Sequence, residues 1–99
     1  MYQNGIGVRQ DLPEAVNWYR KAAEQGDADA QHRLGIMFSY GEGIARDDVR
    51  GYAWVDIAAT RGNEEARNYL DTLAIRMTTA QVETARNLSR ELWKSYDLK

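Results

Sequence analysis

Cysteine is absent from this sequence, proline occurs once, and there is no long apolar run. Without cysteine the chain has neither a disulfide framework nor a thiolate zinc site. No stretch approaches the ~20 apolar residues that span a bilayer, and the opening letters MYQNGIGVRQ lack the basic and apolar segments of a secretory signal. We therefore expect a soluble protein without membrane insertion. Both the cytoplasm and a periplasm reached through a leader stay open as compartments.

The sequence also lacks an excess of basic charge. It has 13 lysine and arginine residues against 15 aspartate and glutamate residues, which gives a formal net charge of −2. Nucleic-acid binding requires a broad electropositive surface that neutralises phosphates, so we expect no nucleic-acid partner. The 99 residues suit one small domain, which buries roughly 60–70% of the surface that its unfolded chain exposes.

Side chains suited to catalysis or metal binding are few. His32 is the only histidine, and without cysteine any further metal ligands would be carboxylates, so we expect an ordinary, partly exposed surface histidine. Asp27, Asp29, Asp47 and Asp48 stand at expected helix starts, where N-capping and the helix dipole already account for acidic residues. We expect no catalytic residues, no metal site and no cofactor, and therefore no enzyme.

What the sequence does contain is an internal repeat. A shift of 36 residues aligns ten identical pairs: Met1/Met37, Gly5/Gly41, Gly7/Gly43, Asp11/Asp47, Trp18/Trp54, Ala22/Ala58, Ala23/Ala59, Gly26/Gly62, Ala30/Ala66 and Leu34/Leu70. A period in the thirties is typical of a helical solenoid, in which each unit covers an apolar face that its neighbour cannot bury alone. The recurrence of Gly5-Ile6-Gly7 as Gly41-Glu42-Gly43 predicts a structural turn and not a phosphate loop, because no strand precedes it.

Local signals divide each unit into two helices. Gly26 and Gly62 stand where a helix ends in the left-handed conformation. The expected N-caps are Asp11, Asp27, Asp47 and Asn63. Apolar residues at helical spacing predict the buried stripes. These stripes are Leu12, Ala15, Val16, Tyr19, Ala22 and Ala23, then Ala30, Leu34, Met37 and Phe38, then Val49, Ala53, Trp54, Ile57 and Ala58.

The string MYQNGIGVRQDLPEAVNWYRKAAEQGDADAQHRLGIMF resembles the Sel-one-like repeat (SLR), a relative of the tetratricopeptide repeat. The shared features are G-x-G-V, A-x-x-W-Y-x-x-A-A-x-x-G and A-x-x-x-L-G-x-M-[YF], and the resemblance covers roughly residues 1 to 76. The second unit departs from the first, with Glu42 for Ile6, Gly51 for Ala15 and Val55 for Tyr19. The resemblance implies a non-catalytic scaffold that binds other proteins.

The fold that this resemblance implies is all-α: a right-handed alpha-alpha superhelix, a solenoid of antiparallel helix pairs with about two SLR units and a C-terminal capping helix. We divide the single domain into a partial repeat (1–26), a full repeat (27–62), the first helix of a final unit (63–77) and the capping helix (78–99). In the capping helix, Thr78 and Gln81 form a capping-box pair. We expect the alanines to let helix backbones approach closely, and Trp18, Trp54 and Trp93 to be buried.

In tetratricopeptide-like stacks the first helix of each unit lines the concave side. With Leu34, Gly35 and Phe38 facing inward, helical geometry turns another set of residues toward that groove. The candidate partner-binding residues are Asp29, His32, Ile36, Ser39, Tyr40, Glu65, Asn68, Thr72, Ile75 and Arg76. The apolar members are either contacts for a partner or ordinary exposed hydrophobes. We expect a protein or peptide segment to dock in this groove.

The N-terminal end has no counterpart to the capping helix. Residues 1–4 match only the last turn of a repeat's first helix, so the helix over 12–25 lacks a partner on its upstream face. Two explanations stay open: the chain is a fragment of a longer solenoid, or it forms a homodimer through this N-terminal face. We expect Val16 to lie on the open face, where glutamate would prevent self-association.

Overall fold

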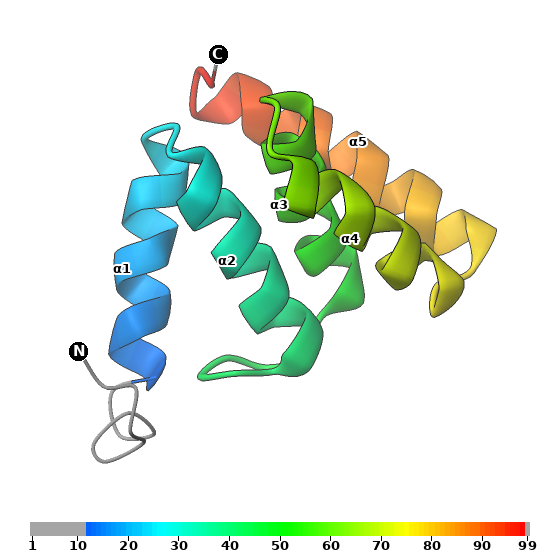
Figure 1. Cartoon of the computed structure of the whole chain (residues 1–99), viewed down its shortest axis with the longest axis horizontal. Helices are drawn as coiled ribbons and strands as arrows, with labels where there is room; N and C mark the ends of the chain where they lie inside the picture. The colour runs from blue at the N-terminus through cyan, green and yellow to red at the C-terminus, as the bar shows by residue number, and fades with distance from the viewer. Residues whose placement is uncertain (1–11, 99) are drawn as a thin grey trace.

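The computed structural model describes residues 12–98 of the chain. Over this range it forms helices and no strands (Figure 1): α1 (Leu12–Glu24), α2 (Ala28–Tyr40), α3 (Asp48–Thr60), α4 (Glu64–Ile75) and α5 (Thr79–Ser95). The expected all-α fold, a superhelix of helix pairs, is confirmed. The expected cap Asp11 and the Gly5-Ile6-Gly7 stretch lie outside the described residues.

Short polar side chains start the helices where the sequence predicts. Asp27 accepts a hydrogen bond from the backbone N–H of Ala30 at 3.0 Å, which satisfies a donor that the first turn of α2 leaves unpaired. The other predicted caps within the described residues behave alike: they are Asp47, Asn63 and Thr78, the last in a reciprocal capping box with Gln81.

The residues that end the helices also follow the repeat. Gly26 and Gly62 have φ angles of +101° and +100°, in the left-handed region that only glycine adopts without strain. Their backbone N–H groups donate to the carbonyl oxygens of Ala23 and Ala59 at 3.1 and 3.0 Å. Both glycines thus terminate α1 and α3 as predicted.

A second pair of hydrogen bonds follows the same period of 36 residues. The Gln31 side-chain amide donates to the carbonyl oxygen of Ala23 at 3.0 Å. One unit later, the Arg67 guanidinium donates to the carbonyl oxygen of Ala59 at 3.3 Å. Different side chains therefore make the same kind of contact, which joins the end of one helix to the first turn of the next. The repeat thus extends to the hydrogen bonding between helices.

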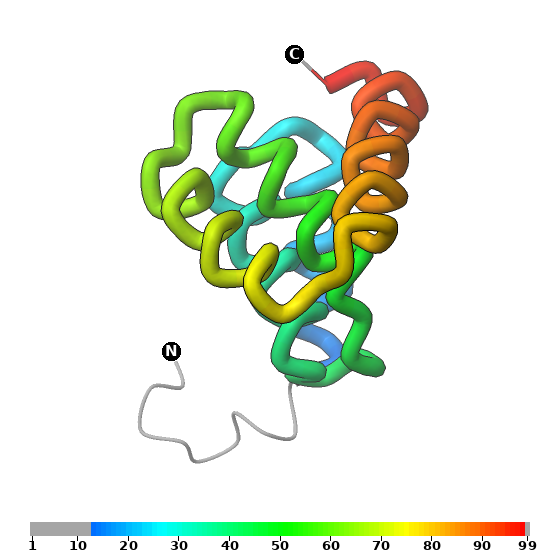
Figure 2. Tube along the Cα trace, turned by 90° about the vertical axis from the view of Figure 1, so that its right-hand side faces the viewer, coloured from blue at the N-terminus to red at the C-terminus, as the bar shows by residue number. Residues whose placement is uncertain are grey.

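The centre of the packing is α3. Its residues from 51 to 59 are all buried except Asp56, which is typical of a helix enclosed on every side. Helices α4 and α5 lie on either side of α3 (Figures 1 and 2), and α2 packs along it. One cluster of buried side chains joins α1, α2, α3 and Leu98, and a second joins α3, α4 and α5.

Two glycines define the closest approach between α2 and α3. A Cβ atom on Gly35 would lie 2.4 Å from Val55 Cγ2 and 2.7 Å from the carbonyl oxygen of Gly51. A Cβ atom on Gly51 would lie 2.9 Å from the carbonyl oxygen of Gly35. Backbone therefore meets backbone at this crossing. The sequence predicted close approach at the alanines and not at this pair of glycines.

The tryptophans do not share one environment. Trp54 is 5% exposed, as expected, and Trp93 is partly buried. Trp18 is 72% exposed, so its assignment to the core was wrong. Trp54 lies on α3, which has described helices on both sides, whereas α1 is the first described helix and has a neighbour on one side only. Equivalent repeat positions are thus buried or exposed according to their neighbours.

The long helix α5 lies along α3 and buries its narrow apolar side there. Ala85 and Ser89 are buried at this contact, and the Ser89 hydroxyl donates to the Asp56 carboxylate at 2.9 Å. Leu98, beyond the helix, is also buried and joins the cluster between α1 and α3. This arrangement supports our proposal that α5 closes the C-terminal end of the solenoid.

Candidate functional site

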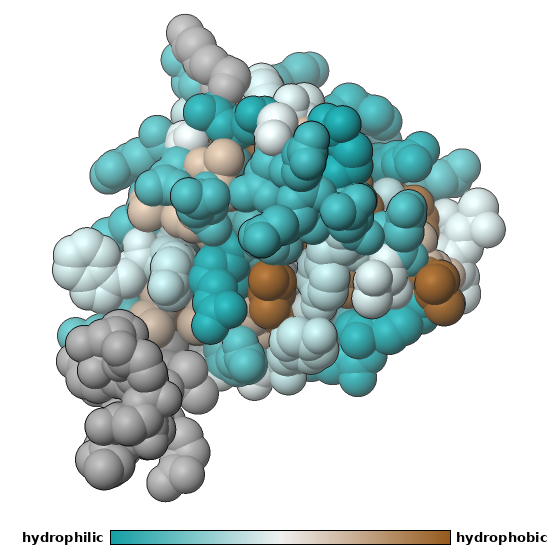
Figure 3. All heavy atoms as spheres, in the orientation of Figure 1, coloured by the Kyte–Doolittle hydropathy of each residue, from teal (hydrophilic) through white to brown (hydrophobic). Residues whose placement is uncertain are grey.

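The candidate groove residues on α2 and α4 lie mostly at the surface. We call this surface the α2–α4 face and define it by Asp29, His32, Ile36, Tyr40, Glu65, Asn68, Thr72, Ile75 and Arg76. His32 and Ile36 are half-buried and the other members are exposed. Figure 3, which views the molecule with α2 and α4 in front, shows a largely hydrophilic face with small, separate hydrophobic spots.

Ser39 was expected on this face but is buried, at 1% exposure. Its hydroxyl donates to the carbonyl oxygen of Ile36 at 2.9 Å and lies 2.9 Å from the Tyr69 hydroxyl. Because Ser39 already donates to Ile36, it accepts from Tyr69. The expectation failed because α4 covers this turn of α2, which the spacing within one helix does not reveal.

Tyr69 joins α2 to α4 and was not among the predicted groove residues. Its ring lies 6.0 Å from the His32 ring, edge to face, and 6.5 Å from the Tyr40 ring. Burial raises the pKa of Tyr69. Its counterpart in the first unit is Arg33, which is exposed. A surface predicted from the equivalent positions of the two units therefore did not include Tyr69.

Polar contacts hold the two ends of the α2–α4 face. At one end the Asn63 amide donates to the Asp29 carboxylate at 3.2 Å. At the other, the Arg76 guanidinium donates to the carbonyl oxygen of Ser39 at 3.2 Å and to the Asp48 carboxylate at 2.8 Å. Burial would raise the pKa of Asp48, but hydrogen bonds from Arg46 and Arg76 hold that pKa below its usual value. These contacts fix α4 relative to α2 and α3.

Titratable groups on the face are not arranged for metal chemistry. Burial lowers the pKa of His32, against the fields of Glu65 and Asp29, which raise it. Among residues 12–98, no three or more His, Cys, Asp or Glu side chains group together in a way that could hold a metal ion. In the same range no helix has the length and apolar character needed to cross a membrane.

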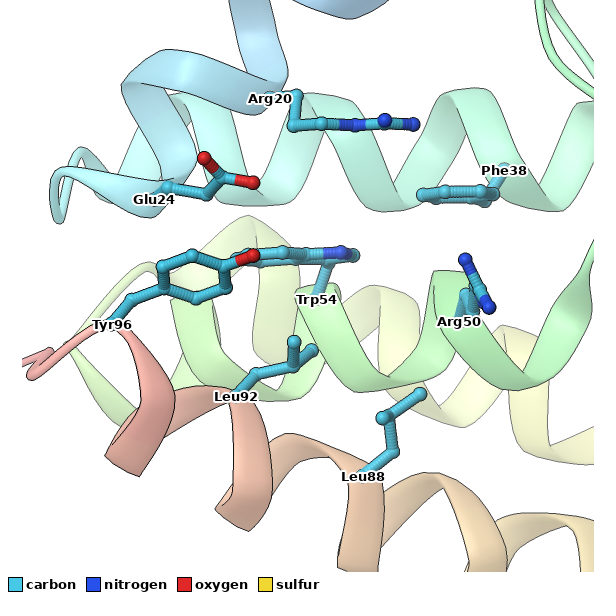
Figure 4. Close-up of a pocket in the computed structure, with 8 residues that line it drawn as sticks. All are labelled: Arg20, Glu24, Phe38, Arg50, Trp54, Leu88, Leu92 and Tyr96. Atoms are coloured by element: carbon cyan, nitrogen blue, oxygen red, sulfur yellow. The ribbon is translucent and has the colours of Figure 1, made fainter.

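A hollow lies among helices α1, α2, α3 and α5 (Figure 4), with a volume of about 240 Å³. We call it the α1–α5 cleft. Its lining residues are Arg20, Glu24, Phe38, Arg50, Trp54, Leu88, Leu92 and Tyr96. The Trp54 and Tyr96 rings are 6.4 Å apart and tilted by 31°. Hydrogen bonding to Glu24 raises the pKa of Tyr96. No motif in the sequence predicted this cleft.

The repeat found in the sequence and in the hydrogen bonds matches a known family. The family model of the Sel1 repeat matches residues 1–27 and 28–63, more than half of the chain. The chain belongs to the Sel1 repeat family. The second matched segment contains α2 and α3, which form one helix pair, and the resemblance drawn from the motifs is confirmed.

Relatives of this Sel1 repeat chain include fungal and bacterial proteins. It is 45% identical over 50 residues to the chitin synthase regulator SKT5 of Malassezia restricta, a match that covers 48% of this chain and 4% of the relative. It is 37% identical over 62 residues to chitin synthase regulatory factor 3 of Schizosaccharomyces pombe, covering 63% and 7%. It is 37% identical over 51 residues to an exopolysaccharide production negative regulator of Rhizobium meliloti, covering 52% and 19%.

A solved structure shares the fold of this Sel1 repeat chain. It is a protective antigen of uropathogenic Escherichia coli strains that displays an SLR fold, with a TM-score of 0.83 and 37% sequence identity. The match covers 87% of this chain and 19% of that one. The chain thus spans a small part of the length of the relatives and of the solved structure that it matches.

Proposed function

We propose that this Sel1 repeat chain is a non-catalytic interaction module that binds a protein or peptide segment on the α2–α4 face. The names of the three relatives described above support a regulatory setting for such binding, since all three are regulators. The exposed aromatic and aliphatic side chains of the face are of the kinds that recognise proteins.

The observation that carries this proposal is a pair of exposed apolar side chains at one end of the face. Ile75 is 84% exposed and Tyr40 is 58% exposed. Their sequence neighbours Arg76 and Ser39 are hydrogen-bonded to each other, so both side chains lie where the ends of α2 and α4 meet. Aromatic and large aliphatic side chains supply much of the binding energy at interfaces when a partner buries them.

Affinity at this face is expected to be modest. Interfaces that bury less than ~1,200 Å² are typically transient. In the described part of the chain, only α2 and α4 are the first helix of a repeat, so a partner can contact only these two helices on this face. Single exposed hydrophobes also occur on surfaces that bind nothing. A binding experiment must therefore distinguish whether Tyr40 and Ile75 contact a partner or are ordinary exposed side chains.

We expect the combined replacement Tyr40→Ser and Ile75→Ser to abolish peptide binding at this face. Peptides selected from a display library against the wild-type chain should bind the double variant at least about tenfold more weakly, because the exposed apolar anchors are lost. Trp18→Ser is the matched control, since it removes an exposed aromatic side chain from another helix. Equal binding of the selected peptides to the double variant would contradict the proposal.

A second candidate function is self-association through the N-terminal face. The observation that favours it is the exposure of Trp18, a large apolar side chain of the kind that protein contacts usually cover. Val16, which was expected on the open face, is instead buried in the cluster between α1 and α3. That placement was wrong because the apolar stripe of α1 faces α2 and α3, so Trp18 is the residue with which to test a dimer.

Light scattering across a concentration series provides this test. If α1 mediates a homodimer, the molar mass should rise with concentration, and Trp18→Lys should return it to the monomer value while helicity stays unchanged. Ile75→Lys serves as control, because it places the same charge at an exposed position on another face. A monomer at every concentration, or a dimer that persists in Trp18→Lys, would exclude self-association through this face.

A further inference from the structure

The α1–α5 cleft is lined mainly by α1, α3 and α5, with Phe38 of α2 at its base, and its lining combines an apolar floor with arginines. We propose that it is a separate docking site for an extended peptide segment in which an aromatic or large aliphatic side chain is followed by an acidic residue. This site is separate from the α2–α4 face proposed above, and each of the two proposals is tested by its own experiment.

The floor of the cleft fits one apolar side chain. Phe38 and Trp54 are buried at its base, and Leu88 and Leu92 of α5 are half-buried along its side. A cavity of about 150 Å³ holds a benzene ring, whereas sites for whole drug-sized ligands start at about 300 Å³. The volume of about 240 Å³ lies between these limits, which suits a single Phe or Leu side chain with part of its backbone.

The charges around the cleft are divided between its two ends. Figure 4 shows Arg20 and Arg50 with their guanidinium groups toward the Phe38 end, and Glu24 beside Tyr96 at the other. Arg50 approaches Asp47 at 3.5 Å, yet 62% of its side chain is exposed. Glu24 lies beside Tyr96 and raises the pKa of its hydroxyl.

This division of charge selects the partner. Two guanidinium groups near one another favour a carboxylate, which they can bind through charge-assisted hydrogen bonds. The Glu24 carboxylate lies at the opposite end, beside Tyr96, so it is not next to an anion bound by Arg20 and Arg50. A bound segment therefore places its apolar side chain over Trp54 and its acidic side chain at the Phe38 end.

The indole N–H signals of the full chain in two-dimensional NMR report on this site, because Trp54 lines the cleft and Trp18 does not. The probe is the peptide acetyl-Gly-Phe-Asp-Gly-amide. We expect its titration to shift the Trp54 signal to saturation and leave the Trp18 signal in place. The neutral peptide acetyl-Gly-Phe-Asn-Gly-amide should bind about threefold more weakly or worse, since an exposed ion pair contributes modestly.

Arginine variants test the source of this charge preference. In the double variant Arg20→Gln, Arg50→Gln the two peptides should bind equally, whereas Arg33→Gln, on the exposed side of α2, should keep the preference for Asp. The Tyr40→Ser, Ile75→Ser variant should bind the probe like wild type, so this result is independent of the function proposed for the α2–α4 face.

Three outcomes would overturn the assignment. One is no Trp54 shift with the Asp peptide up to about 10 mM, beyond the range of weak specific binding. Another is equal binding of acetyl-Gly-Ala-Asp-Gly-amide, which lacks the apolar side chain. The third is a Trp54 signal that moves with protein concentration alone, which would show that a second copy of the chain occupies the cleft.

Discussion

Replacing Trp54 by alanine is expected to lower the free energy of unfolding by about 3–5 kcal/mol, the usual cost of removing a buried aromatic side chain. Trp54 is 5% exposed and belongs to the cluster that joins α1, α2 and α3. A domain of this size has about 5–15 kcal/mol of stability in total, so much of the Trp54→Ala protein should be unfolded at modest urea concentrations.

Trp18→Ala is the matched control, because it removes the same side chain from the equivalent repeat position. Trp18 is 72% exposed, and surface replacements usually change stability by no more than about 0.5 kcal/mol. Urea unfolding of both variants, followed by circular dichroism, measures the difference. Similar midpoints for Trp54→Ala and Trp18→Ala would mean that the two tryptophans are not buried as the structure shows.

Replacing Gly35 by alanine is expected to lower the free energy of unfolding by about 1–3 kcal/mol, although alanine is the better helix former by about 1 kcal/mol. The added methyl group would meet Val55 Cγ2 at 2.4 Å and the carbonyl oxygen of Gly51 at 2.7 Å. A side chain such as Val55 could rotate, but the Gly51 backbone could move only with the whole of α3.

Urea unfolding would measure this loss of stability as a lower midpoint concentration, with an unchanged dependence of the unfolding free energy on urea. Arg33→Ala is the control, since it places alanine at an exposed position of the same helix and should be close to neutral. If Gly35→Ala stabilised the protein by the helix-propensity gain alone, α2 and α3 would not be in backbone contact at this crossing.

The helices and their ends could be predicted from the sequence because their signals are local. The Asp27 carboxylate and the N–H that it binds are three residues apart, and the left-handed turn at Gly26 depends on glycine itself. The family also followed from the letters, since the period of 36 residues and the motifs recur along the chain.

The candidate surfaces could be predicted only in part. The period correctly placed Tyr40 and Ile75 at the surface, but it also placed Ser39 there, and Ser39 is covered by Tyr69 from α4. The α1–α5 cleft gathers residues from four helices, and no repeat motif marks their meeting. The binding roles of both surfaces stay predictions until the experiments above are made.

The sequence by itself determined the helix class, the repeat, the caps and the family, because each depends on side chains within about one helical turn or on a pattern that recurs along the chain. Only the tertiary structure decided that Trp54 is buried and Trp18 exposed, that Gly35 meets Gly51, and that a cleft opens between α1 and α5. The physical reason is that burial and close contact depend on helices distant in sequence. Two identical repeat positions therefore differ once their neighbours differ.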